Sequence, residues 1–203
     1  MNIEVFADIW CPFTHVGLRT IAEQRAERGR PDVGIIVRAW PLELVNGAPM
    51  DPYKARDHAE ELREQVAPTM FTKLDPEHFP TSTLDALALV HRAYQAGIAV
   101  GERASFGLRD ALFEHGRDIS DLAELRAIAD ELGIDMPHAD DHAAVLADWE
   151  EGQQRGVLGS PHFFCGADHL FCPSLAITRD PEAGLIIDTD TARLSSFLDA
   201  CLQ

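Results

Sequence analysis

A cysteine followed by a proline is the strongest chemical signal in the sequence. Cys11 comes after a short segment rich in Ile, Val and Phe, and Pro12 opens a segment with helical spacing of its apolar residues. Proline suits the first position of a helix, because its missing N–H would lack an intrahelical partner there. Cys11 is therefore expected at the N-cap, where its sulfur can accept from the amides of Phe13 and Thr14 and the helix dipole favours the thiolate. The sequence predicts a reactive thiol with a lowered pKa, and the alternative is a buried, inert cysteine in a fold that has lost its activity.

The motif Cys-Pro-Phe-Thr lacks the second cysteine of a redox pair. Thr14 stands in its place, and its hydroxyl can donate to the Cys11 sulfur from one turn along the helix. A thiolate at Cys11 can attack a disulfide sulfur or another electrophile. A mixed disulfide on Cys11 must then be cleared by a small thiol or by a more distant cysteine. Cys165 and Cys172 are the candidates, with a place in the core as the alternative for each, and Cys201 is expected in the core.

Other side chains flank the thiol in the sequence. Trp10, Pro12 and Phe13 are assigned to substrate binding, with Trp10 and Phe13 forming an apolar rim or, alternatively, half-buried packing. His15 can stabilise a thiolate or transfer protons, because histidine changes charge near neutral pH. In the first turn of a helix it can equally face solvent.

Four histidine and cysteine residues near the C-terminus are close enough in the sequence to be considered as metal ligands. His162, Cys165, His169 and Cys172 offer the ligand types of tetrahedral zinc. However, His162 and Cys165 would point to opposite faces of a regular strand, since side chains alternate with a period of two. His138 and His142 stand among acidic residues and fit the solvated start of a helix. We therefore expect no metal site.

Composition and charge exclude several functional classes. The chain has 203 residues, 46% of them hydrophobic, and a formal net charge of −17. Nucleic acids and anionic membrane surfaces attract basic proteins, so neither is an expected partner. No apolar run approaches the ~20 residues of a membrane span, and the start does not resemble a secretory signal. We expect a cytoplasmic protein, in which the four cysteines are mostly reduced.

The hydrophobic pattern divides the chain into three parts. A strand, a helix and a second strand come first, and the middle has helical periodicity with almost no strand signal. A hairpin and a final helix follow, with one further short strand between them. The expected strands are 2–7, 33–40, 162–165, 170–172 and 184–187, and the expected helices are 12–28, 52–66, 82–97, 101–115, 121–132, 139–152 and 191–202.

This arrangement resembles the thioredoxin fold of the DsbA family, which carries an inserted helical domain. Residues 8–17 with Arg19 look like the Asp-x-x-Cys-Pro-Trp-Cys-x-x-Gly segment of FrnE-like oxidoreductases. Those proteins are relatives of 2-hydroxychromene-2-carboxylate isomerase and of the kappa-class glutathione transferases. Residues 38–44 resemble the second strand of that branch, and residues 156–161 resemble the loop that carries its cis-proline.

The resemblance implies an α/β, thioredoxin-like fold with an inserted all-helical domain. Residues 1–48 and 153–203 would form the thioredoxin-like domain, and residues 49–152 the insertion, which would close over Cys11. Pro161 is expected to be cis and to lie beside Cys11, with a trans proline opening a strand as the alternative. In the family, the backbone of the residue before this proline, here Ser160, pairs with a bound peptide or thiol. The sequence departs from the branch at Thr14 and in the long segment 173–190, where a shorter link is expected.

Three functions fit these observations. The first is a thiol-dependent oxidoreductase with a single catalytic cysteine, Cys11, supported by Thr14. The second is a kappa-type thiol transferase or isomerase that uses a small thiol, such as glutathione or mycothiol, as its cofactor. The third is a non-catalytic binding protein of the same fold. No tightly bound cofactor is expected, and the expected partners are small-molecule thiols or disulfides, protein disulfides, and a second copy of the chain in a homodimer.

Overall fold

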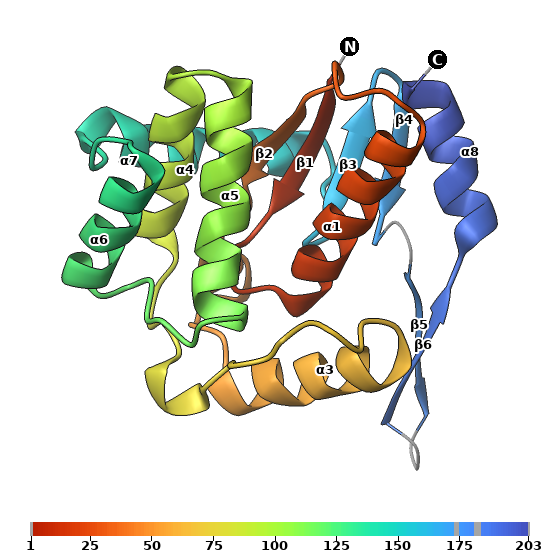
Figure 1. The fold of residues 1–203 in the computed structure, drawn as a ribbon, viewed down its shortest axis with the longest axis horizontal. Coiled ribbons are helices and arrows are strands. Elements are labelled where there is room, and N and C mark those ends of the chain that lie inside the picture. The colour runs from red at the N-terminus through yellow and green to blue at the C-terminus, as the bar shows by residue number, and fades with distance from the viewer. Residues whose placement is uncertain (1, 173–174, 181–183, 203) are drawn as a thin grey trace.

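A four-stranded sheet forms the centre of the molecule, in the order β2-β1-β3-β4 (Figure 1). The computed structural model describes residues 2–172, 175–180 and 184–202. β1 (Ile3–Ala7) pairs in parallel with β2 (Ile35–Ala39) and antiparallel with β3 (His162–Cys165). β4 (Asp168–Phe171) pairs with β3 at the edge. The β-α-β unit and the later hairpin expected from the sequence are therefore present.

Two helices pack on one face of this sheet. α1 (Pro12–Glu27) joins β1 to β2, and α8 (Thr191–Cys201) follows the last strand (Figure 1). Because side chains alternate along a strand, the odd-numbered residues of β1 and β3 point together into this layer. Val5 and Phe163 are fully buried there with Leu18 of α1 and Leu198 of α8. This layer is one of two apolar cores.

The part of the chain between β2 and β3 is mostly helical. The five helices expected here are present, and the structure adds a short helix and a 3-10 turn that the sequence did not predict. The unpredicted helix has five residues and none of them is buried, so no apolar periodicity marks it. The elements are α2 (Leu42–Asn46), α3 (Pro52–Gln65), η1 (Pro76–His78), α4 (Leu84–Gln95), α5 (Ile98–Phe113), α6 (Leu122–Leu132) and α7 (Ala139–Gln154).

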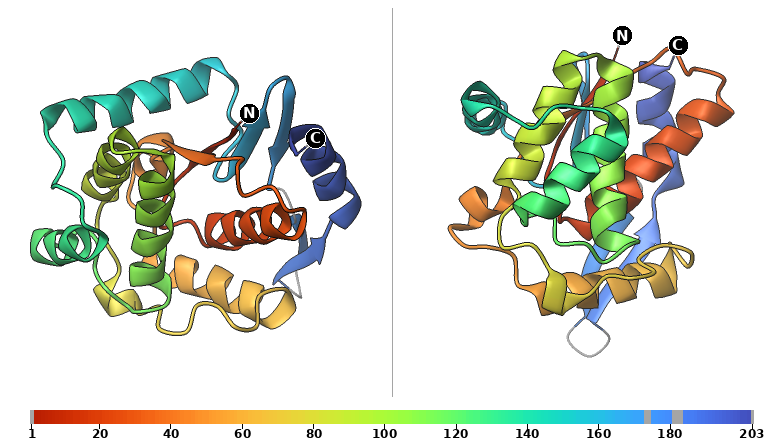
Figure 2. Two further views of the ribbon diagram at one scale, coloured as in Figure 1. Left: turned by 45° about the horizontal axis from the view of Figure 1, so that its top comes forward. Right: turned by 60° about the vertical axis from the view of Figure 1, so that its left-hand side comes forward.

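α7 returns the chain to the sheet and contacts β2 (Figure 2). Its close approach requires Gly152, because a Cβ atom there would lie 2.5 Å from the Trp40 ring. The Asp148 carboxylate of the same helix accepts from the Ala39 amide and from Arg38. These contacts anchor the end of the helical segment beside the loop that leads into β3.

A separate hairpin, β5 (Leu175–Asp180) and β6 (Gly184–Thr189), extends away from the central sheet beside α3 (Figure 1). The sequence predicted only a short strand at 184–187, and Pro173 and Ser174, where its departure from the resembled branch begins, lie outside the described residues. Gln65 of α3 donates to the Leu185 carbonyl at 3.0 Å and accepts from the Ile187 amide at 2.9 Å. The hairpin thus depends on a distant helix, which local patterning does not reveal.

The central strands come from residues 3–39 and 162–171, on either side of the helical segment. On this basis we propose that the chain has two domains. Residues 1–48 and 153–203 form the first, and residues 49–152 form the second. Residues 1, 173–174, 181–183 and 203 of these ranges lie outside the described part of the chain. Within the described residues, no helix combines the length and apolar character needed to cross a membrane.

Candidate active site

Cys11 caps the N-terminus of α1, directly after the carboxyl end of β1. Pro12 occupies the first helical position, and the Cys11 carbonyl accepts from the amides of Thr14 and His15. The Cys11 thiol donates to the Ser160 carbonyl oxygen at 3.1 Å. Its side chain is 4% exposed. The structure therefore brings together Cys11 and Ser160, which are 149 positions apart in the sequence.

A chain of hydrogen bonds joins three segments at the thiol. The Thr14 and Ser160 hydroxyl oxygens lie 2.7 Å apart, and the Ser160 hydroxyl accepts from the Asp8 amide at 2.8 Å. The Ser160–Pro161 peptide bond is cis. The end of β1, the first turn of α1 and the loop before β3 are thus connected through Ser160.

Burial raises the pKa of the Cys11 thiol above its usual value, and the nearby Asp8 carboxyl adds to this effect. Hydrogen bonds from the side chain and backbone of Thr14 and from Ser160 act in the opposite direction but do not outweigh burial. The lowered pKa expected from the helix N-terminus is therefore wrong for this arrangement. A protonated thiol fits the contact with the Ser160 carbonyl, because only the protonated form can donate.

Asp8 is a buried carboxyl group next to the thiol that sequence reasoning missed. Its two oxygens accept from the amides of Ile9 at 2.7 Å and Leu42 at 2.5 Å. Burial raises its pKa to about 6, although the bonds from Leu42, Thr83 and Ile9 and the charge of Arg109 lower it. The available signal was an aspartate inside an otherwise apolar strand end, three residues before a cysteine.

Arg109 of α5 is a second buried polar residue that the sequence did not single out. Its guanidinium donates to the carbonyl and hydroxyl oxygens of Ser105 and to the Asp8 carbonyl. Its Nε atom has no hydrogen-bond partner among the described residues. Burial lowers its pKa to about 10, which still leaves it charged at neutral pH. Arg109 places a positive charge behind the site and offsets the burial of Asp8.

Trp10 and His15 do not line a rim around the thiol. The Trp10 side chain is fully buried and stacks on Phe79, with ring centroids 6.1 Å apart. His15 is also buried, and its Nε2 atom lies 2.9 Å from a Glu114 carboxylate oxygen. Burial lowers the pKa of His15, so its imidazole is neutral at physiological pH. The rim expected at Trp10 and the solvent-facing alternative for His15 are both wrong, because the helical segment covers these side chains.

Phe13 lies in a groove beside the site. The groove has a volume of about 520 Å³, and Ser160, His58 and Cys172 also contribute to its lining. The Phe13 ring contacts His58, with ring centroids 5.4 Å apart. The remaining lining comes from the end of β4, the β5–β6 hairpin and the start of α8, namely Phe171, Leu175, Ile177, Leu185 and Arg193.

The four cysteines are all free thiols in distinct surroundings. Cys165 lies in the core beneath α8, and its sulfur is hydrogen-bonded to Cys201. Cys172 lines the groove, and its amide donates to the Pro161 carbonyl at 3.1 Å. Burial raises the pKa of Cys172 to about 12, with a further contribution from Cys11. Of the two candidates for a second reactive cysteine, Cys172 rather than Cys165 therefore lies near Cys11.

The chain matches the DSBA-like thioredoxin domain over residues 2–176. It belongs to the DSBA-like thioredoxin family. This is a family of thiol–disulfide oxidoreductases and isomerases. The α/β, thioredoxin-like fold with inserted helices expected from the sequence is confirmed. Among curated proteins, none matches the sequence.

Solved structures of other proteins share this DSBA-like fold. A probable DsbA oxidoreductase from Streptomyces coelicolor is 19% identical, with a TM-score of 0.66 and coverage of 98% of this chain and 89% of the other. A 2-hydroxychromene-2-carboxylate isomerase is 15% identical, with a TM-score of 0.62 and coverage of 84% and 88%. The cytosolic disulfide reductase DsbM from Pseudomonas aeruginosa, solved with GSH, is 16% identical, with a TM-score of 0.57 and coverage of 100% and 96%.

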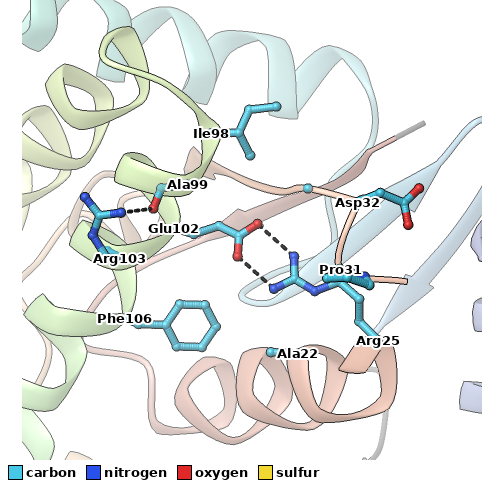
Figure 3. A pocket seen from close by; sticks show the side chains of 10 residues that line it. Ala22, Arg25, Pro31, Asp32, Ile98, Ala99, Glu102, Arg103 and Phe106 are labelled. Atoms are coloured by element: carbon cyan, nitrogen blue, oxygen red, sulfur yellow. Dashed lines mark hydrogen bonds and ion pairs between the residues drawn. The ribbon is translucent and has the colours of Figure 1, made fainter. Parts of the chain in front are cut away.

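A second cavity lies at the other end of this DSBA-like domain, between α1 and α5 (Figure 3). Its charged residues are paired across it, because Arg25 forms two hydrogen bonds with Glu102 at 2.8 and 2.9 Å (Figure 3). Glu102 also accepts from the Ile35 amide at the start of β2. These contacts tie the helical segment to the sheet, at the opposite end of α1 from Cys11.

The histidines and cysteines considered as zinc ligands do not point toward a common position. His162 and Phe164 lie on one face of β3, whereas Phe163 and Cys165 lie in the core under α1 and α8. The His162 Nε2 and His169 Nδ1 atoms lie 3.0 Å apart, and the His162 Nδ1 atom accepts from the Leu158 amide. Among the described residues, no group of three or more His, Cys, Asp or Glu side chains could hold a metal ion.

Proposed function

We propose that the protein is a thiol-dependent oxidoreductase in which Cys11 acts as a single catalytic nucleophile. The observation that supports this most directly is the Cys11 thiol at the N-terminus of α1, in contact with the loop that carries Pro161. The hydroxyls of Thr14 and Ser160, together with the backbone of Thr14, lower the pKa of the thiol. They would therefore stabilise the thiolate once it forms.

The proposed reaction proceeds in two exchanges. The Cys11 thiol loses its proton to solvent, and the thiolate attacks one sulfur of a disulfide. A bond forms between the Cys11 sulfur and that sulfur, the substrate S–S bond breaks, and the other half leaves as a thiolate. A small thiol, for which we propose glutathione or mycothiol, then attacks the mixed disulfide as its own thiolate. That step releases the Cys11 thiolate and a new disulfide, so electrons balance in each exchange.

Ser160 would position the substrate. In the resting site its carbonyl accepts from the Cys11 thiol. The thiolate has no proton to donate, so deprotonation frees this carbonyl to accept from a substrate amide. Activation of the nucleophile and exposure of the acceptor would then occur together. Phe13, at the groove beside Ser160, supplies an apolar contact for the same substrate.

A thiol transferase or isomerase of the kappa type is the second candidate. The raised pKa of Cys11 favours it, because a neutral thiol can donate a hydrogen bond to a bound thiolate without reacting. In this case the site would hold a small thiol as a cofactor and direct it to an organic substrate. For either function we propose a cytoplasmic location and no tightly bound resident cofactor, and a homodimer stays an expectation from the resemblance.

Intact-mass measurement separates these functions. The protein is incubated with glutathione disulfide, and wild type is compared with Cys11→Ser and with Cys201→Ser, whose thiol lies in the core. We expect a glutathione adduct in wild type and in Cys201→Ser. Cys11→Ser should form no adduct and should lose disulfide exchange. Glutathione binding that survives Cys11→Ser in calorimetry would support the transferase. Absence of both adduct and binding in wild type would leave a non-catalytic protein and refute both enzymes.

A further inference from the structure

We propose that the groove beside Ser160 selects disulfides and thiols whose non-reacting part is apolar and carries a carboxylate, with Arg193 binding the carboxylate. This inference rests on the proposed function, since it names the substrate class of the Cys11 site. Two features of the groove support it: an apolar wall and an exposed guanidinium.

The apolar wall comes from the β5–β6 hairpin and the end of β4. Ile177 pairs with Ile187 across the hairpin, so Leu175, Ile177 and Leu185 all belong to the same face. That face forms part of the groove together with Phe13 and Phe171. Leu175 and Leu185 are buried, whereas Ile177 is 36% exposed. A partly exposed isoleucine in a concave apolar surface leaves apolar area for a ligand to cover.

The charge of the groove is opposite to that of the protein as a whole. The chain carries a net charge of −17, yet Arg193 is a lining residue, and among the described residues no aspartate or glutamate lines the groove. The Arg193 side chain is exposed, and its guanidinium has no hydrogen-bond or ion-pair partner within the described ranges. Its charge reaches the site, because it lowers the pKa values of both His162 and Cys172. An unpartnered guanidinium next to apolar surface is well suited to bind a carboxylate through two parallel hydrogen bonds.

The groove and the nucleophile are joined through Ser160, which lines the groove and accepts from the Cys11 thiol. A disulfide R–S–S–R whose R group lies on the apolar wall is placed for attack at the sulfur nearer Cys11. The bond between Cys11 and that sulfur forms as R–S⁻ leaves, and the carboxylate on R stays bound and unchanged. Arg193 therefore acts on binding and orientation rather than on the chemistry of the thiol.

Two chromophoric aromatic disulfides, one with carboxylates and one neutral, test this assignment. Dithiobis(nitrobenzoate) carries a carboxylate on each aromatic ring, whereas dithiodipyridine is neutral, and both release a coloured product. Second-order rate constants are measured for both probes in a Cys172→Ser background, so that the groove contains no second thiol. The ratio of the two rate constants cancels the intrinsic reactivity of Cys11. We compare Arg193→Gln with Arg103→Gln, which removes an arginine from the cavity at the other end of α1.

We expect Arg193→Gln to lower the carboxylate-to-neutral ratio by about tenfold, because a charge-assisted contact is lost. Arg103→Gln should leave the ratio unchanged. Ile177→Asp should lower the ratio as well, since it places a negative charge on the apolar wall. A ratio that is unaffected by Arg193→Gln overturns the inference, while a reaction that still requires Cys11 leaves the proposed function standing. If product release persists in Cys11→Ser, the proposed function itself fails.

Discussion

The hydroxyl of Thr14 lies 2.7 Å from the hydroxyl of Ser160, at the position where a dithiol site would have its second sulfur. The contact fixes the first turn of α1 against the loop that contains Pro161. It also places two hydroxyl groups around the Cys11 sulfur. Threonine at this position therefore gives the thiol a polar partner, and it offers no sulfur that could clear a mixed disulfide.

Thr14→Val should raise the pKa of Cys11 further. The hydroxyl is the strongest of the hydrogen-bonding influences that lower this pKa, and valine retains the shape but cannot donate. We expect a further rise in this pKa and a reaction up to about tenfold slower at neutral pH, because less of the thiol is ionised. Ultraviolet titration of the thiolate measures the change. Thr14→Ser, which keeps the hydroxyl, serves as the control, and an equal shift in both variants would contradict the assignment.

Thr14→Cys should create a dithiol site in which the new cysteine resolves the mixed disulfide on Cys11. Position 14 lies one helical turn from Cys11, with its backbone amide bonded to the Cys11 carbonyl. We expect an intramolecular disulfide after oxidation, seen as a loss of two hydrogens in the intact mass, and a gain of insulin reduction when a dithiol is supplied. Cys11→Ser in the same variant should abolish both. A variant that folds but never closes the disulfide would show that the helix start is wrongly oriented for dithiol chemistry.

Asp8→Asn should change how stability depends on pH. The pKa of Asp8 is about 6 in the folded protein against a usual value of 3.8. Asp8 therefore stabilises the fold fully only below about pH 4, and this contribution is lost as the pH rises through about 6. We expect the free energy of unfolding of wild type, relative to Asp8→Asn, to rise by up to about 3 kcal/mol between about pH 7.5 and pH 4.

Urea unfolding at several pH values measures this difference. Asparagine provides one acceptor oxygen for the amides of Ile9 and Leu42 where aspartate provides two. That loss shifts the stability of the variant at every pH by the same amount, so the pH-dependent part isolates the titration of Asp8. A difference between wild type and variant that is independent of pH would contradict the raised pKa.

Cys172→Ser should not slow the clearing of the mixed disulfide by an added small thiol. The pKa of Cys172 is about 12, so roughly one molecule in 10⁵ carries its thiolate at pH 7. We therefore expect the adduct on Cys11 to persist until an external thiol is added, with the same second-order rate in wild type, Cys172→Ser and Cys165→Ser. Rapid formation of a disulfide between Cys11 and Cys172, seen by peptide mapping, would contradict this expectation.

The sequence predicted the features that depend on neighbouring residues. The strand before Cys11 and the helix from Pro12 follow from short-range patterns, whereas the position of Pro161 beside Cys11 was expected from the family resemblance. The structure places Cys11 against Ser160. The sign of the Cys11 pKa shift was wrong because it depends on burial, to which distant parts of the chain such as the Ser160 loop contribute. Asp8 and Arg109 were missed for the same reason, since the burial of a charged side chain leaves little trace in its immediate sequence.

The contact of Gln65 with β6 of the groove wall has an evolutionary consequence. Its side-chain amide satisfies a carbonyl and an N–H of β6, as a neighbouring strand would, although it belongs to α3. The wall and its attachment point are thus encoded more than a hundred residues apart. Recombination that exchanged the helical segment alone would separate the two. We expect natural or designed chimaeras of this fold to retain ligand preference only when both segments descend from the same parent.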